Sequence, residues 1–83
     1  MSGTVRVLAF AGAREAMGVG ERSLSIERSV TARELLRRLC DEHPLLAPHA
    51  ASLRVAINGA YAAWDDEIHD GDEVAVIPPV AGG

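Results

Sequence analysis

The sequence ends in Gly82-Gly83, and the carboxylate of Gly83 is its strongest candidate for a reactive group. Neither glycine has a side chain, so a partner can approach the backbone closely. A terminal carboxyl group has a pKa of about 3.3–3.7, and its ionised form is a poor electrophile. It reacts once it is activated, for example as an acyl-adenylate, and then accepts sulfur or an amine. Because no motif here predicts nucleotide binding, that activation requires ATP and a second enzyme.

A pair of prolines separates this end from the residues before it. Pro78 and Pro79 follow a predicted strand, residues 73–77, and proline lacks the N–H that strand pairing needs. At about 3.3–3.6 Å per residue, the chain beyond Pro79 spans roughly 16–18 Å. We therefore predict a folded domain over residues 1–78 and an extended tail over 79–83. The residues expected to contact a partner are Ile77, Pro78, Pro79, Val80, Ala81 and Gly82.

Other reactive side chains do not form a recognisable site. Cys40 falls on the apolar side of a predicted helix, which favours packing over a nucleophilic role. His43, His49 and His69 lack the spacing of a zinc site. The acidic residues lack the spacing of a calcium loop, and the glycines lack that of a phosphate-binding loop. We expect no bound metal or cofactor and no catalytic activity of the chain alone.

Length and composition indicate one globular domain of 83 residues, 48% of them hydrophobic. A single cysteine cannot form an internal disulfide, which suits a reducing cytoplasm. The sequence contains neither a long apolar run nor a signal peptide, so we expect a cytoplasmic protein that does not contact a membrane.

The charge is unevenly distributed along the chain. All eight basic residues are arginines, the last of them Arg54, and six acids follow within residues 65–73. This distribution argues against nucleic-acid binding. It favours a basic partner near the tail, although a solvated loop that aids solubility explains the acids equally well. The absence of lysine from these 83 residues excludes lysine-linked chains of the protein on itself.

The hydrophobic pattern predicts one long helix. Thr31 to Glu34 forms a capping box, Val30 is placed to contact Leu35, and Pro44 ends the helix. Strands are expected over residues 5–10, covered on both faces, and over 22–27, 53–57, 61–63 and 73–77. A helical turn is expected over 12–17, a second short helix near Pro48, and tight turns at Asn58-Gly59 and Asp70-Gly71. Trp64 is expected to be a partly buried anchor.

This order, ββαβββ, predicts an α+β fold with one helix packed across a mixed sheet. The helix connects two strand pairs, so the first and last strands can lie side by side and parallel. Both are the most apolar strands, as expected for a central pair. The arrangement is the β-grasp, or ubiquitin-like, fold.

The segment from Asp70 to Gly83, with its Pro-Pro-Val-Ala-Gly-Gly end, resembles the C-terminus of the small subunit of molybdopterin synthase. Residues 7–11 with Arg14-Glu15, and residues 56–58, resemble other parts of that sulfur-carrier family. The resemblance spans the whole chain. Family members often carry aromatic residues where Ala9, Val76 and Ile77 stand here.

This resemblance implies a sulfur carrier. Gly83 would be adenylated by an E1-like enzyme that uses ATP, and converted to a thiocarboxylate. The tail would enter the large subunit, in a heterotetrameric synthase, and donate sulfur to cyclic pyranopterin monophosphate. Three alternatives remain: a sulfur carrier for the thiazole of thiamine or another sulfur-transfer pathway, a ubiquitin-like protein modifier, and a binding module whose tail docks unmodified.

Overall fold

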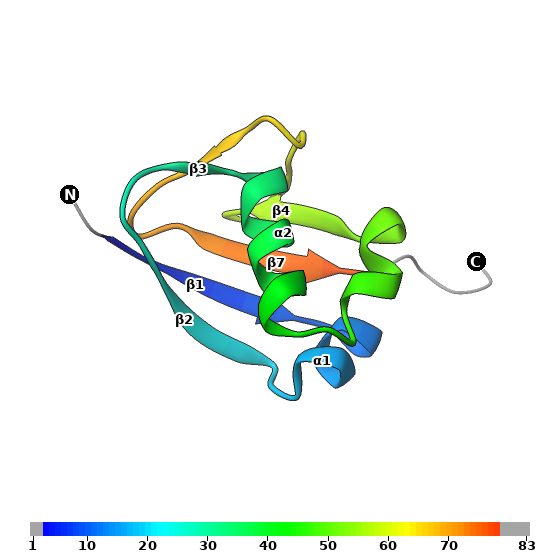
Figure 1. The fold of residues 1–83 in the computed structure, drawn as a ribbon. Coiled ribbons are helices and arrows are strands. Elements are labelled where there is room, and N and C mark those ends of the chain that lie inside the picture. The colour runs from blue at the N-terminus through cyan, green and yellow to red at the C-terminus, as the bar shows by residue number, and fades with distance from the viewer. Residues whose placement is uncertain (1–2, 79–83) are drawn as a thin grey trace.

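The computed structural model describes residues 3–78 and contains a five-stranded sheet under one long helix (Figure 1). The spatial order of the sheet is β2-β1-β7-β4-β5. Its strands are β1 (Gly3–Ala9), β2 (Glu21–Ile26), β4 (Arg54–Ile57), β5 (Ala60–Tyr61) and β7 (Glu73–Ile77). A separate two-stranded sheet pairs β3 (Val30–Thr31) with β6 (Glu67–Ile68).

The first and last strands are central and parallel, as predicted. Val7 is in register with Val74, and Ala9 with Val76. β2 and β4 flank this pair in antiparallel directions. The β-grasp prediction is therefore confirmed.

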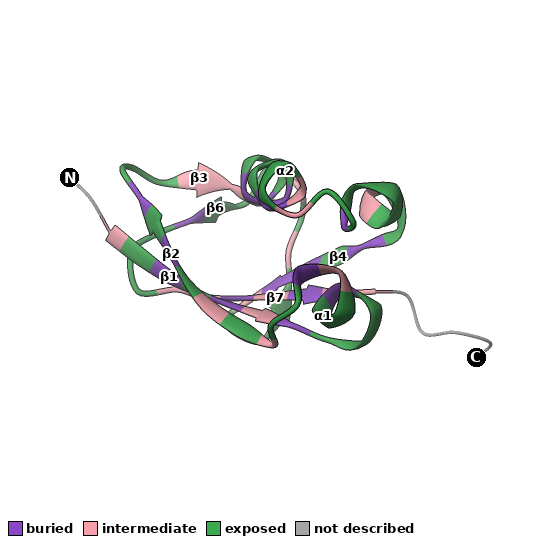
Figure 2. Cartoon of the chain, turned by 60° about the horizontal axis from the view of Figure 1, so that its bottom comes forward, coloured by how far each residue is buried: buried purple, intermediate pink, exposed green. Residues whose placement is uncertain are grey.

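The prediction that the first strand is covered on both faces is wrong. Val5, Val7 and Ala9 are buried, whereas Thr4 and Arg6 are exposed and Leu8 is half-buried. Burial alternates because only one face of the sheet packs against α2 (Ala32–Glu42) (Figure 2). The apolar side chains on the opposite face therefore do not belong to the core.

Helix α2 begins as predicted. The backbone N–H of Glu34 donates to Thr31 Oγ1 at 3.1 Å, and the N–H of Thr31 donates to Glu34 Oε1 at 2.9 Å. The buried residues of this helix are Ala32, Leu35, Leu36 and Leu39. The helix ends at Glu42. The next residue, His43, precedes Pro44, and the residue before a proline is disfavoured in helical conformation.

The shorter elements also follow the predicted positions. Helix α1 (Ala11–Met17) ends at Gly18, which has φ 78°. The element near Pro48 is a 3-10 helix, η1 (Ala47–Ser52). Asn58 and Gly59 have φ of 50° and 87° and connect β4 to β5, as a tight hairpin turn requires.

Two predictions about strands need correction. The strand expected over residues 61–63 is only Ala60–Tyr61. The pairing of β3 with β6 was not predicted, because two-residue strands leave no alternating pattern to read. This small sheet joins the start of α2 to the loop before β7.

Candidate functional site

The candidate site begins where β7 leaves the sheet. Ile77, the last residue of β7, is in register with Arg54 of β4, and Pro78 is half-buried. The predicted reactive position Gly83 and the predicted contact residues of the tail after Pro78 lie outside the described residues. These residues are Pro79, Val80, Ala81 and Gly82. The structure therefore places Ile77 and Pro78, and it places them at the end of the central strand.

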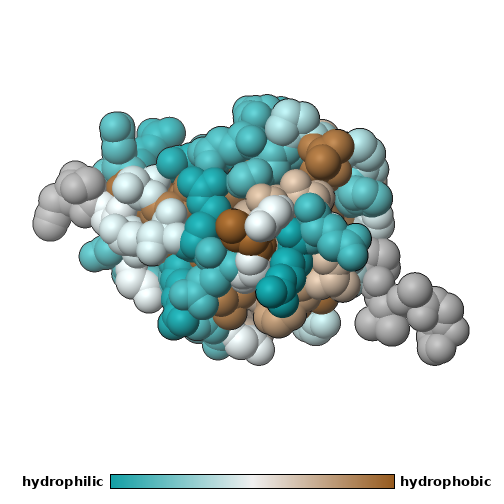
Figure 3. Space-filling model, turned by 90° about the horizontal axis from the view of Figure 1, so that it is seen from below, coloured by the Kyte–Doolittle hydropathy of each residue, from teal (hydrophilic) through white to brown (hydrophobic). Residues whose placement is uncertain are grey.

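Next to this end of β7, the outer face of the sheet carries a shallow hollow of about 330 Å³. Its lining includes Leu8, Ala75 and Ile77 from the central strands. Phe10 and Tyr61 border it and are 49% and 75% exposed. We call these five residues the sheet-face patch. On the side of the molecule seen in Figure 3, by contrast with this patch, the hydrophobic residues form separate spots among hydrophilic ones.

A charged cluster lies on the same face of the sheet, nearer the start of β7. Arg6 Nε lies 2.8 Å from Glu21 Oε2, and Arg6 Nη1 lies 3.9 Å from Glu73 Oε2. The hydrogen bond with Glu21 raises the pKa of Arg6 and lowers the pKa of Glu21. Since Glu73 also lines the hollow, the hollow has an apolar end near Pro78 and a charged end far from it.

The acidic segment predicted to attract a basic partner has local roles in the fold. Asp70 Oδ1 accepts the backbone N–H of Thr4 at 2.8 Å, and Asp66 Oδ2 accepts that of Ala63 at 2.9 Å. Asp65 pairs with Arg33. These carboxylates close turns and hold loops together, and their effect on partner binding stays a prediction.

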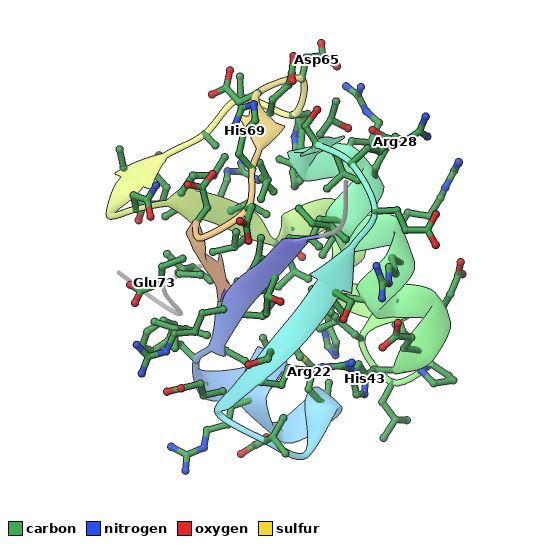
Figure 4. All side chains as sticks on the ribbon, turned by 90° about the vertical axis from the view of Figure 1, so that its left-hand side faces the viewer. Arg22, Arg28, His43, Asp65, His69 and Glu73 are labelled. Atoms are coloured by element: carbon green, nitrogen blue, oxygen red, sulfur yellow. The ribbon has the colours of Figure 1, made fainter. Side chains whose placement is uncertain are left out.

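Asp72 is the most connected residue of this segment. Its Oδ2 accepts the backbone N–H of His69 at 2.8 Å, and its Oδ1 accepts the side-chain N–H of Asn58 at 3.0 Å. Both bonds lower the pKa of Asp72, and the bond from His69 has the larger effect. The turn before β7 is thereby fixed to the β4–β5 hairpin. Figure 4 labels Asp65, His69 and Glu73, which mark the course of the segment.

Cys40 behaves as the sequence predicts for a packing residue, whereas His49 and His69 are exposed. Cys40 is half-buried, and burial, with a smaller effect of Asp41, raises the pKa of its thiol. His43 Nε2 lies 3.0 Å from Arg22 Nη1, and it must accept this bond because arginine can only donate (Figure 4). Residues 3–78 contain no cluster of potential ligands that could hold a metal ion.

Trp64 is half-buried against the core, as predicted. Its carbonyl oxygen accepts the backbone N–H of Arg33 at 3.0 Å, and that of Asp66 accepts the N–H of Ala32 at 2.9 Å. The loop thus satisfies donors in the first turn of α2, a role that the sequence analysis missed. A possible signal was the apolar pair Val30 and Ile68, which are partners in β3 and β6.

A protein-family comparison adds to this geometry, since the model of the ThiS family matches residues 7–83. The chain belongs to the ThiS family. The match includes the last three residues of β1, all of β7, the sheet-face patch and the Gly-Gly end. None of the helices within residues 3–78 of this ThiS-family chain is long and apolar enough to cross a membrane.

The curated relatives of this ThiS-family chain carry a common name. The molybdopterin synthase sulfur carrier subunit of Chlamydomonas reinhardtii is 36% identical over 81 residues, covering 95% of this chain and 98% of the relative. The protein of the same name from Homo sapiens is 34% identical over 82 residues, covering 95% and 93%.

Solved structures show the same fold. A Pyrococcus furiosus protein assigned as subunit 1 of molybdopterin converting factor has a TM-score of 0.84 and 31% identity, covering 94% of this chain and 99% of its own. Small archaeal modifier protein 1 of Methanosarcina acetivorans has a TM-score of 0.81 and 29% identity, covering 100% and 99%. A protein assigned to molybdopterin conversion and a protein modifier therefore share this architecture.

Proposed function

We propose that this chain is the sulfur-carrier subunit of a molybdopterin synthase. The observation that carries the proposal is the near full-length similarity to curated sulfur carrier subunits, at 34–36% identity for the two relatives described. The geometry adds a reason for the division of labour. The folded body presents an apolar docking face, and the chain leaves that body at Pro78, beside the face.

The chemistry takes place at Gly83. An E1-like enzyme transfers AMP from ATP to the Gly83 carboxylate and releases pyrophosphate. Hydrosulfide, or a donor equivalent to it, then attacks the carbonyl carbon, the bond to the AMP oxygen breaks, and a thiocarboxylate and AMP result. Inside the large subunit the thiocarboxylate sulfur forms a bond to a carbon of cyclic pyranopterin monophosphate, and an oxygen substituent leaves that carbon. Water then cleaves the bond between this sulfur and the Gly83 carbonyl carbon, which leaves the sulfur on the acceptor and regenerates the Gly83 carboxylate. Two such transfers supply both sulfurs of the dithiolene that binds molybdenum.

The division between the two subunits follows from these steps. This chain contributes the sulfur donor, and the large subunit contributes the pocket for the acceptor. Gly82 keeps the chain narrow next to the reacting carbonyl, because a residue without a side chain passes through a channel that excludes larger ones. Pro78 and Pro79 restrict the backbone and aim the tail away from the sheet.

The docking face is the sheet-face patch. A tail of five residues offers little contact area, whereas a standard interface buries about 800 Å² on each partner. Tyr61 and Phe10 are large, exposed and aromatic, and aromatic residues are enriched at the centres of interfaces. We expect Tyr61→Ser to weaken binding to the large subunit at least tenfold without changing the melting temperature. Val19→Ser, at an exposed position outside the patch, is the matched control.

The decisive experiment is intact-mass measurement of the protein after co-expression with its activating enzyme. The expected product is heavier by the difference between one sulfur and one oxygen, and this difference disappears when Gly83 is deleted. The deletion should leave the melting temperature unchanged, because the predicted tail lies outside the core. An unmodified terminus in the presence of a functional activating enzyme and sulfur source would contradict the proposal.

A second candidate is a ubiquitin-like protein modifier. It is favoured by the 29% identity and shared fold with small archaeal modifier protein 1. In this case the activated Gly83 carbonyl accepts a lysine amine of another protein and forms an isopeptide bond. Tryptic peptides of the natural chain would not carry a short remnant, since no arginine or lysine lies near Gly83. A Pro79→Arg variant creates a cleavage site that leaves a Val-Ala-Gly-Gly remnant on the modified lysine, which mass spectrometry detects. Protein conjugates without a thiocarboxylate would show that the chain is a protein modifier. Sulfur transfer only to the thiazole of thiamine would show that it is a sulfur carrier for thiamine synthesis.

A further inference from the structure

A second concave surface lies on the opposite side of the domain from the sheet-face patch. It is a groove of about 450 Å³ between α2 and η1, and Trp64 also lines it. Leu36 and Cys40 line one side and Ala47 and Ala50 the other. The alanines leave it open because they have no side chain beyond Cβ. The lining is mostly apolar, and the proposed sulfur chemistry makes no use of it.

Three charged residues line this α2–η1 groove, and one of them, Arg33, is paired with Asp65. The other two have opposite signs. Arg37 and Asp41 both line it, both are exposed, and they stand four positions apart on α2. Such pairs commonly interact with each other within a helix. Here neither forms an ion pair within 4.0 Å with any residue of the described part, 3–78, whereas Arg22, Arg33 and Arg38 all do. One positive and one negative group are thus left available to an external partner.

We propose that the α2–η1 groove binds a second copy of this chain, with the two α2 helices antiparallel about a twofold axis beside Cys40. In a twofold interface the same surface is used by both copies, so a contact from one residue to another occurs twice. The midpoint between Arg37 and Asp41 along α2 lies next to Cys40. An antiparallel arrangement centred there brings Arg37 of each copy to Asp41 of the other. The charge pattern is complementary to itself.

The same two charges favour a second copy over an unrelated partner. Neither forms an ion pair within residues 3–78, and the twofold arrangement gives each of them a group of opposite sign at the edge of a mostly apolar groove.

The expected dimer is weak. The whole chain has an accessible surface of 5153 Å², and the proposed interface uses parts of two helices and one tryptophan. A small interface has few contacts to offset the free-energy cost of association, so we expect a dissociation constant above about 1 µM. Sedimentation equilibrium up to about 1 mM protein covers the range in which such a dimer forms.

The experiment measures the dissociation constant, under reducing conditions, for the wild type, Arg37→Asp, Asp41→Arg and the double variant that carries both changes. Each single reversal places like charges opposite each other twice, and we expect dimerisation to weaken at least tenfold. The double variant restores opposite charges with the signs exchanged, and should dimerise within about threefold of the wild type.

Two groups report directly on the groove, because the only tryptophan and the only cysteine of the chain line it. Trp64 fluorescence should change, and alkylation of Cys40 by iodoacetamide should slow, over the concentration range in which the dimer forms. Arg54→Asp and Glu15→Arg change the net charge equally at exposed positions outside the groove, and should leave the dissociation constant unchanged.

Several outcomes would overturn the proposal. One is a wild type that stays monomeric up to about 1 mM, and another is a double variant no better than either single one. A dimer that persists in both single variants but is lost in Tyr61→Ser would place the contact on the sheet-face patch instead. Because the substituted charges are exposed, circular dichroism should show all variants folded, which separates lost dimerisation from unfolding.

Discussion

Ala9 of β1 and Val76 of β7 are partners in the parallel pair at the centre of the sheet, and both are buried, with 4% and 0% of their surface exposed. The family resemblance described for the sequence implies aromatic residues at these positions and at position 77 in other members. Here the two inward positions, Ala9 and Val76, carry small side chains, so aliphatic groups fill the core beside the end of β7. Ile77, which follows Val76, points to the other face and is half-buried.

We therefore expect Val76→Phe to destabilise the fold by about 1–3 kcal/mol, because a larger ring must fit against a packed core. Ile77→Phe is the matched control and should change stability by no more than about 0.5 kcal/mol, since its side chain faces the open side of the sheet. Urea denaturation followed by circular dichroism measures both. Equal effects of the two substitutions would mean that the core has room for an aromatic residue.

The turn before β7 should make stability depend on pH through Asp72. Its pKa is lowered in the folded protein, so its contribution is present above the unfolded pKa of about 3.9 and is lost as pH falls through the folded value. Between about pH 5 and pH 2, the urea midpoint of the wild type should fall more than that of Asp72→Asn. Above about pH 5, the wild type should be the more stable of the two. Parallel pH profiles would show that Asp72 does not contribute in this way.

Gly82 should be required for activation and not for docking. In Gly82→Val the branched side chain blocks the narrow channel that we propose around the reacting carbonyl, so thiocarboxylate formation should fall by at least a hundredfold. The affinity of the body for the large subunit should stay within about threefold, because the sheet-face patch is unchanged. Intact mass measures the first quantity and calorimetric titration the second. A fully loaded Gly82→Val protein would count against a narrow channel.

The acidic segment allows a test of electrostatic steering at a residue that does not close a turn. Glu67 is exposed, and its Oε1 lies 3.5 Å from His69 Nε2. If the large subunit presents a basic surface, Glu67→Lys should slow association at about 0.01 M salt, and the difference should vanish near 1 M, where screening is nearly complete. Stopped-flow kinetics measures the rates, with Glu15→Lys as the control of equal charge. Equal rates for both proteins at low salt would exclude steering by Glu67.

Much of the fold could be predicted because strong local signals agree with the tertiary structure. The capping box at Thr31, the turn at Asn58-Gly59 and the apolar first and last strands all specify their own positions. The sequence could not show whether one or both faces of the central strands are buried in the domain. A strand whose outer face packs against a second helix and a strand whose outer face binds a partner have the same apolar sequence. The apolar residues of the sheet-face patch are the reason for that error.

The candidate site was predictable in part. Ile77 and Pro78 lie where the sequence indicates, at the end of the central strand. Phe10 and Tyr61 were not singled out, since their meeting depends on the order β1-β7-β4-β5, which brings distant segments to one face. The local bonds of Asp66, Asp70 and Asp72 were also missed, because a run of acids in a sequence does not show which backbone groups they reach.

The position of β7 has a mechanical consequence. This strand is held by ladders on both sides, to β1 and to β4, and the chain continues from it into the proposed tail. A force applied to the tail therefore loads both ladders in shear, and their hydrogen bonds must break together instead of one after another. A force that pulls the protein from this end would therefore meet the greatest resistance at the start of unfolding. The domain should stay folded while its tail is extracted from a tight complex.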